Sequence, residues 1–230
     1  MILDPLFLLV AAPGLLLGLW AQARVKGAYA RARRQPARSG LTGAQAAARI
    51  LEQNGLYGVQ IEPTRGFLGD HYDPRRKVLR LSPDVYQGRS LAAVGIAAHE
   101  AGHALQDAQR YGPLALRNGI VPLASVGSNL SFGLLFVGFI LNMVHLIYAA
   151  IFLYTLVVIF QLVNLPVEFD ASRRARELLV SYGIVAPGED GTVRKVLNAA
   201  ALTYVAATVT AILTLLYFLM RAGLLGGRSD

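Results

Sequence analysis

Residues 97–106 read AAHEAGHALQ, a stretch with two histidines four positions apart and a glutamate directly after the first. The alanines and leucines around them favour a helix. On a helix His99 and His103 are about 400° apart, so they project from nearly the same face with Cβ atoms about 5–6 Å apart. Two imidazoles placed in this way can bind one metal ion.

Glu100 lies next to the first histidine and has a different expected role. A catalytic zinc site uses three protein ligands and leaves the fourth position for water. On a helix Glu100 points about 100° away from His99, so it can reach that water without binding the metal. Zinc lowers the pKa of bound water toward about 7, and a carboxylate can then accept its proton. The His-Glu-x-x-His spacing therefore predicts hydrolysis by zinc-activated water, with Glu100 as general base.

The motif supplies only two ligands, so the third must come from elsewhere in the chain. The chain has no cysteine, which excludes a disulfide framework, a thiolate metal site and a cysteine nucleophile. Glu168 lies among apolar residues, where an unpaired carboxylate would be costly and a metal would compensate it. The candidates for the third ligand are Glu168, Asp170, His71 and His145.

The other three candidates also have simpler interpretations. Asp170 has Arg173 and Arg174 at i+3 and i+4, as in a surface ion pair. His145 lies in or beside an apolar block and can serve as a polar contact between helices. His71 lies in a predicted turn, where it could stabilise an oxyanion or bind substrate, or simply be solvated.

The composition indicates a membrane protein. Hydrophobic residues make up 54% of the 230 residues, more than one globular core of that length normally needs. They gather into blocks of about 20 residues, the length that a helix needs to cross about 30 Å of hydrocarbon. The four blocks are 2–20, 119–141, 143–165 and 201–220. The leading residues MILD hold an acidic residue and no basic one, which favours an uncleaved anchor over a signal peptide.

The distribution of basic residues predicts the orientation. Of 22 lysines and arginines, 15 lie in 23–118 and five in 166–199. Four spans place these two segments on the same side, which the positive-inside rule makes cytoplasmic. The net charge of +8 and the basic run 24–38 are then explained by basic residues held next to anionic lipid at the membrane surface. We therefore expect no nucleic-acid binding. We expect a multi-pass protein of the cell membrane with its site facing the cytoplasm.

These observations predict an organisation along the chain. A cytoplasmic catalytic region, 23–118, follows the first transmembrane helix, and a cytoplasmic helical segment with the third-ligand candidate separates the last two spans. The expected segments are transmembrane helix 1 (1–22), the catalytic region (23–118), a transmembrane hairpin of helices 2 and 3 (119–165), the helical segment (166–199), transmembrane helix 4 (200–222) and a tail (223–230).

Local signals predict the elements of the catalytic region. Thr42 and Gln45 have the form of a capping box ahead of a helix. The segments 57–63 and 76–82 alternate apolar and polar residues, which predicts a β-hairpin or two short strands. If 76–82 lies at an edge, it could pair with an extended peptide. Ser90 can cap the motif helix, which Gly112 and Pro113 would end after about residue 110.

A separate helix is predicted after the third apolar block. Asn164 can cap it, and Pro166 suits an early helical position. The helix would run to about Tyr182 and would carry Glu168 and Asp170.

Three stretches together resemble the YugP-type neutral zinc metallopeptidases of bacterial membranes. They are DHYDPRRKVLRLSPDVY at 70–86, AAHEAGHALQ at 97–106 and LPVEFDASRRA at 165–175. The resemblance extends from about residue 43 to the fourth apolar block. It implies a membrane-bound zinc metalloendopeptidase that acts on peptide or protein substrates from the cytoplasmic side.

More distantly, the sequence is similar to HtpX and the CAAX-prenyl endoproteases, gluzincins whose third ligand is a glutamate in a Glu-x-x-x-Asp helix. On that pattern Glu168 takes the ligand position, and Ser172 stands where an aspartate is expected. His99 or His103 would then be oriented by Ser172, a backbone carbonyl or Asp107. The similarity implies a mainly α multi-span protein with a cytoplasmic gluzincin-like α+β peptidase domain, and it suggests a role in membrane protein quality control.

Two other functions fit part of the sequence. A site-2-type intramembrane protease also uses His-Glu-x-Gly-His, but the motif helix is too short to span a membrane, and no Leu-Asp-Gly follows to supply an aspartate ligand. A membrane scaffold with a structural metal would need no catalysis. Zinc stoichiometry together with casein hydrolysis separates the scaffold from the peptidases.

Overall fold

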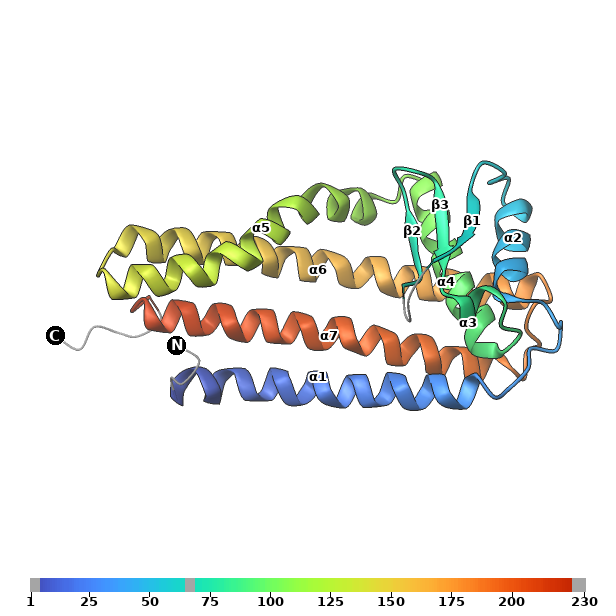
Figure 1. The fold of residues 1–230 in the computed structure, drawn as a ribbon, viewed down its shortest axis with the longest axis horizontal. Coiled ribbons are helices and arrows are strands. Elements are labelled where there is room, and N and C mark those ends of the chain that lie inside the picture. The colour runs from blue at the N-terminus through green and yellow to red at the C-terminus, as the bar shows by residue number, and fades with distance from the viewer. Residues whose placement is uncertain (1–4, 65–68, 225–230) are drawn as a thin grey trace. The chain divides into compact units, whose positions relative to one another are not determined.

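The computed structural model describes residues 5–64 and 69–224, and this part is mostly helical with one small sheet (Figure 1). Residues 2–4 of the first apolar block and 225–230 of the expected tail lie outside it. The chain forms two compact units. Unit 1 contains the described residues of Met1–Ala21, Ala115–Pro166 and Leu202–Asp230, and unit 2 those of Gln22–Leu114 and Val167–Ala201.

Four helices of the described chain are long and apolar enough to cross a membrane, which confirms the predicted number of candidate spans. They are α1 (Pro5–Ala32), α5 (Gly112–Ile140), α6 (Val144–Ser181) and α7 (Asp190–Arg221). Large apolar side chains on their unit 1 portions are exposed, for example Leu9, Leu16 and Phe152. Such surfaces suit contact with lipid.

Small residues let the unit 1 portions of these helices approach closely. A Cβ atom built on Gly14 of α1 would lie 2.6 Å from Thr210 Oγ1 of α7. A Cβ atom on Gly127 of α5 would lie 2.7 Å from the Leu153 carbonyl oxygen of α6. Helices that pack in lipid rely on such contacts because no hydrophobic force drives them together there.

The bounds of three of these helices differ from the prediction. α1 continues to Ala32 through much of the basic run, and α5 already begins at Gly112. Pro166 was expected to begin a helix, but it lies inside α6. Buried residues on either side of it, Val158 in unit 1 and Val167 in unit 2, hold the helix by tertiary packing, which outweighs the local preference for a break.

The sheet of unit 2 has three strands in the order β1-β3-β2. They are β1 (Gln60–Pro63), β2 (His71–Asp73) and β3 (Val78–Leu81). β1 pairs with β3 in parallel, so the predicted hairpin between 57–63 and 76–82 is wrong. β3 is the central strand, so the expectation that it could lie at an edge is wrong as well.

The hairpin instead joins β2 to β3, which are antiparallel. Asp73 Oδ1 accepts hydrogen bonds from the backbone N–H groups of Arg75 and Arg76, and Lys77 adopts a positive φ of 55°. Asp73 thus organises a tight turn through its own side chain. His71, expected in the turn, is the first residue of β2.

The helices of unit 2 begin where the sequence predicts. α2 (Gly43–Gln53) has the complete capping box of Thr42 and Gln45, and Ser90 Oγ accepts from Ala93 N at the start of α4 (Leu91–Ala108). The short α3 (Pro83–Tyr86) lies between them in the chain. Most of α4 is buried in a core that α2, the sheet and the unit 2 portions of α6 and α7 also supply. Its residues include Ile50, Leu79, Leu81, Val94, Leu179 and Ile184.

Gly102 allows α4 to approach α6 closely within unit 2. A Cβ atom there would lie 2.9 Å from the Ala171 carbonyl oxygen and 3.4 Å from its carbonyl carbon. That distance is shorter than an ordinary contact, so any side chain would push the two backbones apart. The helix turn that carries the two motif histidines is therefore held against the turn of α6 that carries Glu168.

We predict that Gly102→Ala destabilises the protein by about 1–3 kcal/mol, because the added methyl group overpacks a contact with backbone. The measurement is the midpoint of thermal unfolding of the purified protein in detergent. Gly191→Ala in α7 is the matched control, since nothing lies within 4 Å of its Cβ position. The control should keep or slightly raise the midpoint. Equal midpoints for the two variants would contradict the importance of this close approach.

Candidate metal centre

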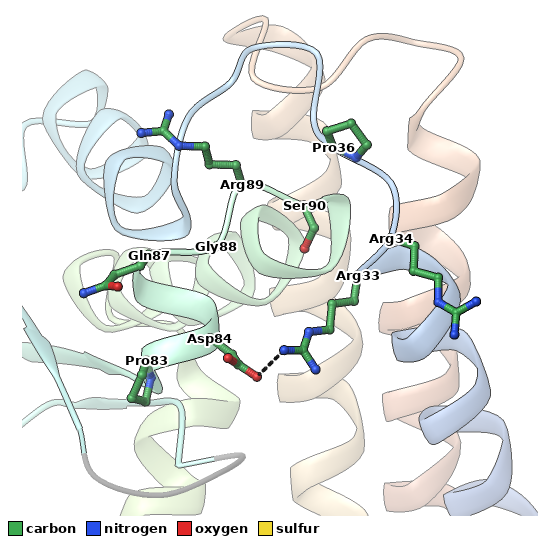
Figure 2. A pocket seen from close by; sticks show the side chains of 9 residues that line it. All are labelled: Arg33, Arg34, Pro36, Pro83, Asp84, Gln87, Gly88, Arg89 and Ser90. Atoms are coloured by element: carbon green, nitrogen blue, oxygen red, sulfur yellow. Dashed lines mark ion pairs between the residues drawn. The ribbon is translucent and has the colours of Figure 1, made fainter.

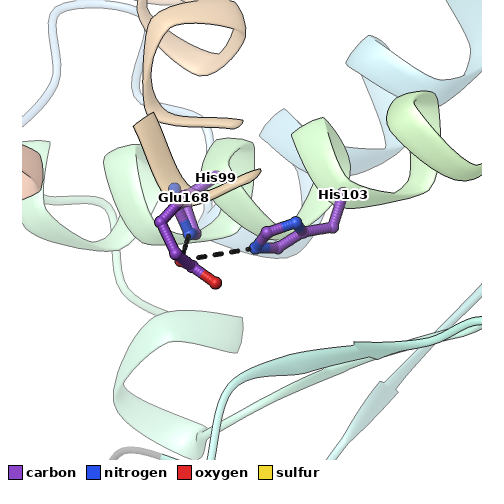
Figure 3. A group of neighbouring side chains, drawn as sticks. All are labelled: His99, His103 and Glu168. Atoms are coloured by element: carbon purple, nitrogen blue, oxygen red, sulfur yellow. Dashed lines mark ion pairs between the residues drawn. The ribbon is translucent and has the colours of Figure 1, made fainter. Parts of the chain in front are cut away.

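Three side chains of unit 2 bring their ligand atoms together (Figure 3). His99 and His103 extend from α4, and Glu168 extends from α6. Glu168 Oε2 lies 3.3 Å from His99 Nε2 and 3.7 Å from His103 Nε2. All three ligand atoms lie within 4.8 Å of one another. Among the residues that the structure describes, this is the group of histidine and acidic side chains that could hold a metal ion.

Each imidazole has a partner for its other ring nitrogen. His99 Nδ1 lies 3.2 Å from Ser172 Oγ, and His103 Nδ1 lies 2.9 Å from Gln106 Oε1. These contacts turn both Nε2 atoms toward the carboxylate of Glu168. Orientation through the second ring nitrogen is what histidine ligands of metals usually require.

One of these partners was predicted and one was missed. Ser172 was among the alternatives for orienting a histidine. Asp107 was another, but its Oδ2 instead accepts from the Tyr72 hydroxyl at 2.7 Å and from Lys77 Nζ. Gln106 was overlooked, although a polar residue three positions after His103 lies on the same helix face and could have been found from that spacing.

Burial decides the electrostatics of the two glutamates. Glu168 is 3% exposed; burial raises its pKa, but its contacts with His103 and His99 outweigh that effect and hold the pKa below its usual range. Burial raises the pKa of Glu100 to about 7, and the charges of Glu168 and Asp70 act in the same direction. The Glu100 carboxyl group therefore holds a proton more readily than an ordinary glutamate does, as suits a group that accepts and returns a proton.

The other candidate ligands lie outside this group. Asp170 forms the expected ion pairs with Arg173 and Arg174, and its Oδ2 also accepts from Gln106 Nε2. His145 is exposed near the start of α6. His71 is exposed too, and its Nδ1 lies 2.7 Å from the Gly69 carbonyl oxygen.

A cavity of about 450 Å³ lies elsewhere in unit 2 (Figure 2). Arg33 and Asp84 form an ion pair of 3.2 Å beside it. No residue of the histidine and glutamate group lines it. The lining residues are Arg33, Arg34, Pro36, Pro83, Asp84, Gln87, Gly88, Arg89 and Ser90.

The donor atoms of the group fit zinc. Two imidazole nitrogens and one carboxylate oxygen are a common ligand set for this ion, and they leave one tetrahedral position open. The partners at Nδ1 leave the Nε2 atoms as the ligating nitrogens. Three protein donors with an open position are typical of catalytic rather than structural zinc sites.

Comparisons with known proteins agree with this chemistry. A family model described as "putative neutral zinc metallopeptidase" matches residues 7–223. A Bacillus subtilis (strain 168) protein described as "Putative membrane protease YugP" is 48% identical over 215 residues, which cover 94% of this chain and 95% of that protein. No solved structure matches the chain. Because both matches cover nearly its whole length, the chain belongs to the family that this model describes as "putative neutral zinc metallopeptidase".

Proposed function

We propose that this protein is a membrane-bound zinc metalloendopeptidase in which His99, His103 and Glu168 hold the zinc ion and Glu100 is the general base. The observation that carries the proposal is the arrangement of both Nε2 atoms around the buried Glu168 carboxylate. The family and the similarity to a protein described as a membrane protease support the peptidase class.

The proposed reaction divides the work between the metal and the side chains. When bound, zinc supplies Lewis-acid chemistry that activates water and polarises a carbonyl group. The Glu100 carboxylate accepts a proton from the attacking water and returns it to the nitrogen of the leaving amine. A pKa of about 7 lets the same carboxyl group perform both transfers near neutral pH.

His71 is the second residue that we propose to act on the substrate. Its charge influences the pKa of Glu100, so it belongs to the electrostatic surroundings of the base. Its exposed ring is accessible to a peptide, and its Nε2 lies 3.5 Å from Arg80 Nη1. We therefore propose that His71 binds the substrate or stabilises an oxyanion.

Two observations favour this function over the alternatives. A site-2-type intramembrane protease would require the motif helix to cross the membrane. α4 is not among the four candidate spans of the described chain. A structural metal in a scaffold protein usually has four protein ligands, whereas three side chains meet here.

We also propose that the site faces the cytoplasm and acts on membrane-associated proteins. The orientation rests on the 20 basic residues in 23–118 and 166–199. The similarity to HtpX suggests membrane protein quality control and a gluzincin-like peptidase domain. Membrane proteomics that compares the wild type with Glu100→Gln would name the substrates, because uncleaved proteins would accumulate.

Glu100→Gln should abolish casein hydrolysis, with a loss of at least about 100-fold, while the protein keeps its zinc. The amide keeps the size of the side chain but cannot accept the proton. Metal analysis and a casein assay on the purified full-length protein measure both quantities. The control is Glu177→Gln, because Glu177 is an exposed residue of α6 that pairs with Arg173. This variant should keep both its zinc content and its casein hydrolysis. Normal turnover by Glu100→Gln would exclude its role as the base.

Glu168→Ala should lower bound zinc and casein hydrolysis together, because it removes one of three ligands and leaves two imidazoles in a buried space. Zinc content after dialysis is the deciding measurement. Glu177→Ala on the same helix should keep the wild-type zinc content. If Glu168→Ala retained full zinc, the third ligand would have to be another residue, with His71 the next to test.

The orientation is testable because the chain has no cysteine. Single cysteines in place of Ser39 and Ser181 should be shielded from an impermeant thiol reagent in intact cells. A cysteine in place of Met143, exposed between α5 and α6, should react. All three should react after the membrane is permeabilised, which controls for burial in the fold. Labelling of Ser39→Cys in intact cells would contradict the cytoplasmic orientation that we propose.

A further inference from the structure

We propose that Gln106 is a positioning residue: it fixes His103 in the tautomer that carries its proton on Nδ1, and it holds the turn of α6 that carries Glu168. One buried amide would then set two of the three metal ligands. This inference rests on the proposed function, because it assigns a role within the same metal site.

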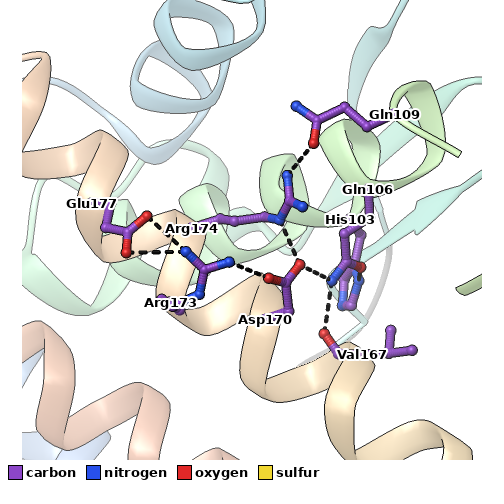
Figure 4. A network of polar contacts seen from close by, with 8 residues as sticks. All are labelled: His103, Gln106, Gln109, Val167, Asp170, Arg173, Arg174 and Glu177. Carbon is purple, nitrogen blue, oxygen red and sulfur yellow. Dashed lines mark hydrogen bonds and ion pairs between the residues drawn. The ribbon is translucent and has the colours of Figure 1, made fainter. Parts of the chain in front are cut away.

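The partners of Gln106 decide which way its amide group points (Figure 4). Gln106 Nε2 lies 2.9 Å from the Val167 carbonyl oxygen and 2.9 Å from Asp170 Oδ2. A backbone carbonyl can only accept hydrogen bonds, and so can an ionised carboxylate. Asp170 is held in that form by ion pairs with Arg173 and with Arg174, whose Nε lies 2.5 Å away. The amide nitrogen of Gln106 must therefore face these two oxygens.

The orientation of the amide then fixes the histidine. Because its Nε2 donates to Val167 and Asp170, Gln106 presents Oε1 to His103 Nδ1 at 2.9 Å. A carbonyl oxygen can only accept, so Nδ1 must donate and must carry the proton. The lone pair of the neutral ring is then on Nε2, the atom that lies 3.7 Å from Glu168 Oε2. A ring in the other tautomer could not bind a metal through Nε2.

Burial makes this assignment strict. Gln106 is 0% exposed, so solvent cannot replace a lost partner. A flipped amide would turn its oxygen toward two other acceptors, at Val167 and Asp170, and its nitrogen toward a protonated Nδ1. Every polar contact would then be unfavourable in a place where unsatisfied groups are most costly.

Gln106 also acts on the opposite side of the site. Its amide nitrogen bonds α6 at Val167, directly before Glu168, and at Asp170, two residues after it. The backbone that presents the Glu168 carboxylate is thereby tied to the same amide that orients His103. Loss of Gln106 should loosen both ligands, whereas Ser172 contacts only His99.

Gln109 provides a matched control on the same stretch of chain. It follows the last residue of α4, and its Oε1 accepts from Arg174 Nη1 at 2.5 Å. It therefore touches the edge of the same network without contacting His103 or the backbone next to Glu168. A substitution there tests the effect of disturbing the arginine alone.

The experiment compares Gln106→Met with Gln109→Met in the purified full-length protein. Zinc affinity is measured by competition with a fluorescent chelator, and the ¹⁵N spectrum of the histidine rings is measured in the metal-free protein. Gln106→Met should bind zinc about 10- to 100-fold more weakly, and its His103 should no longer occupy only the Nδ1–H tautomer. Gln109→Met should match the wild type in both measurements.

The outcomes separate this inference from the proposed function. Wild-type zinc affinity and an unchanged ring spectrum in Gln106→Met would overturn the inference and leave the peptidase proposal standing. A wild type that binds no zinc would overturn the peptidase proposal, and the ring spectra of the metal-free proteins would still test the tautomer.

A second variant covers the case in which Gln106→Met does not fold. Gln106→Glu keeps the shape and the acceptor for His103, but it cannot donate to Val167 and it faces the carboxylate of Asp170. It should keep the Nδ1–H tautomer and still bind zinc about 10-fold more weakly. Unchanged affinity in this variant would overturn the role of Gln106 in holding α6.

Discussion

The contact between α4 and α6 at Gly102 is the constraint on which the candidate metal site depends. Two of the three side chains that could bind a metal come from one helix and the third from another, so their distances follow from how closely the two backbones lie. Gly102 is in the turn between the two histidines, and Ala171 is three residues after Glu168. A side chain at position 102 would push the two backbones apart and would move the donor atoms with them.

The same packing creates an electrostatic problem that the site must solve. Glu100 and Glu168 are both buried within unit 2, and the charge of Glu168 raises the pKa of Glu100. The two imidazoles lower the pKa of Glu168, whereas burial of Glu100 raises its pKa by more than the charge of His99 lowers it. Two carboxyl groups in one site therefore differ in their readiness to hold a proton. One is suited to bind a cation and the other to exchange protons.

Much of this organisation could be predicted from single residues and short spacings. The cap residues Thr42 and Ser90 mark the starts of α2 and α4 because capping is local chemistry. The number of candidate spans follows from apolar blocks of sufficient length. The His-Glu-x-x-His spacing places His99 and His103 on one helix face, and the apolar surroundings of Glu168 singled it out as the partner from a distant segment.

The remaining features depend on contacts between segments far apart in the sequence. Nothing near Pro166 indicates that packing on both sides would keep α6 unbroken, and no local signal shows that β3 lies between β1 and β2. The i+3 spacing of Gln106 indicates its contact with His103, but its contacts with Val167 and Asp170 are to residues about 60 positions away. Its importance is visible only when both helices are present.

The unbroken course of α6 has a consequence for how this chain can diverge. The apolar stretch and Glu168 share one helix without a loop between them. Inserting or deleting a single residue there would rotate everything beyond it by about 100° and shift it by about 1.5 Å. The connection between α6 and α7, by contrast, is a non-helical segment of residues 182–189 that can absorb a change in length. Along α6, residue identities can therefore vary more freely than residue number.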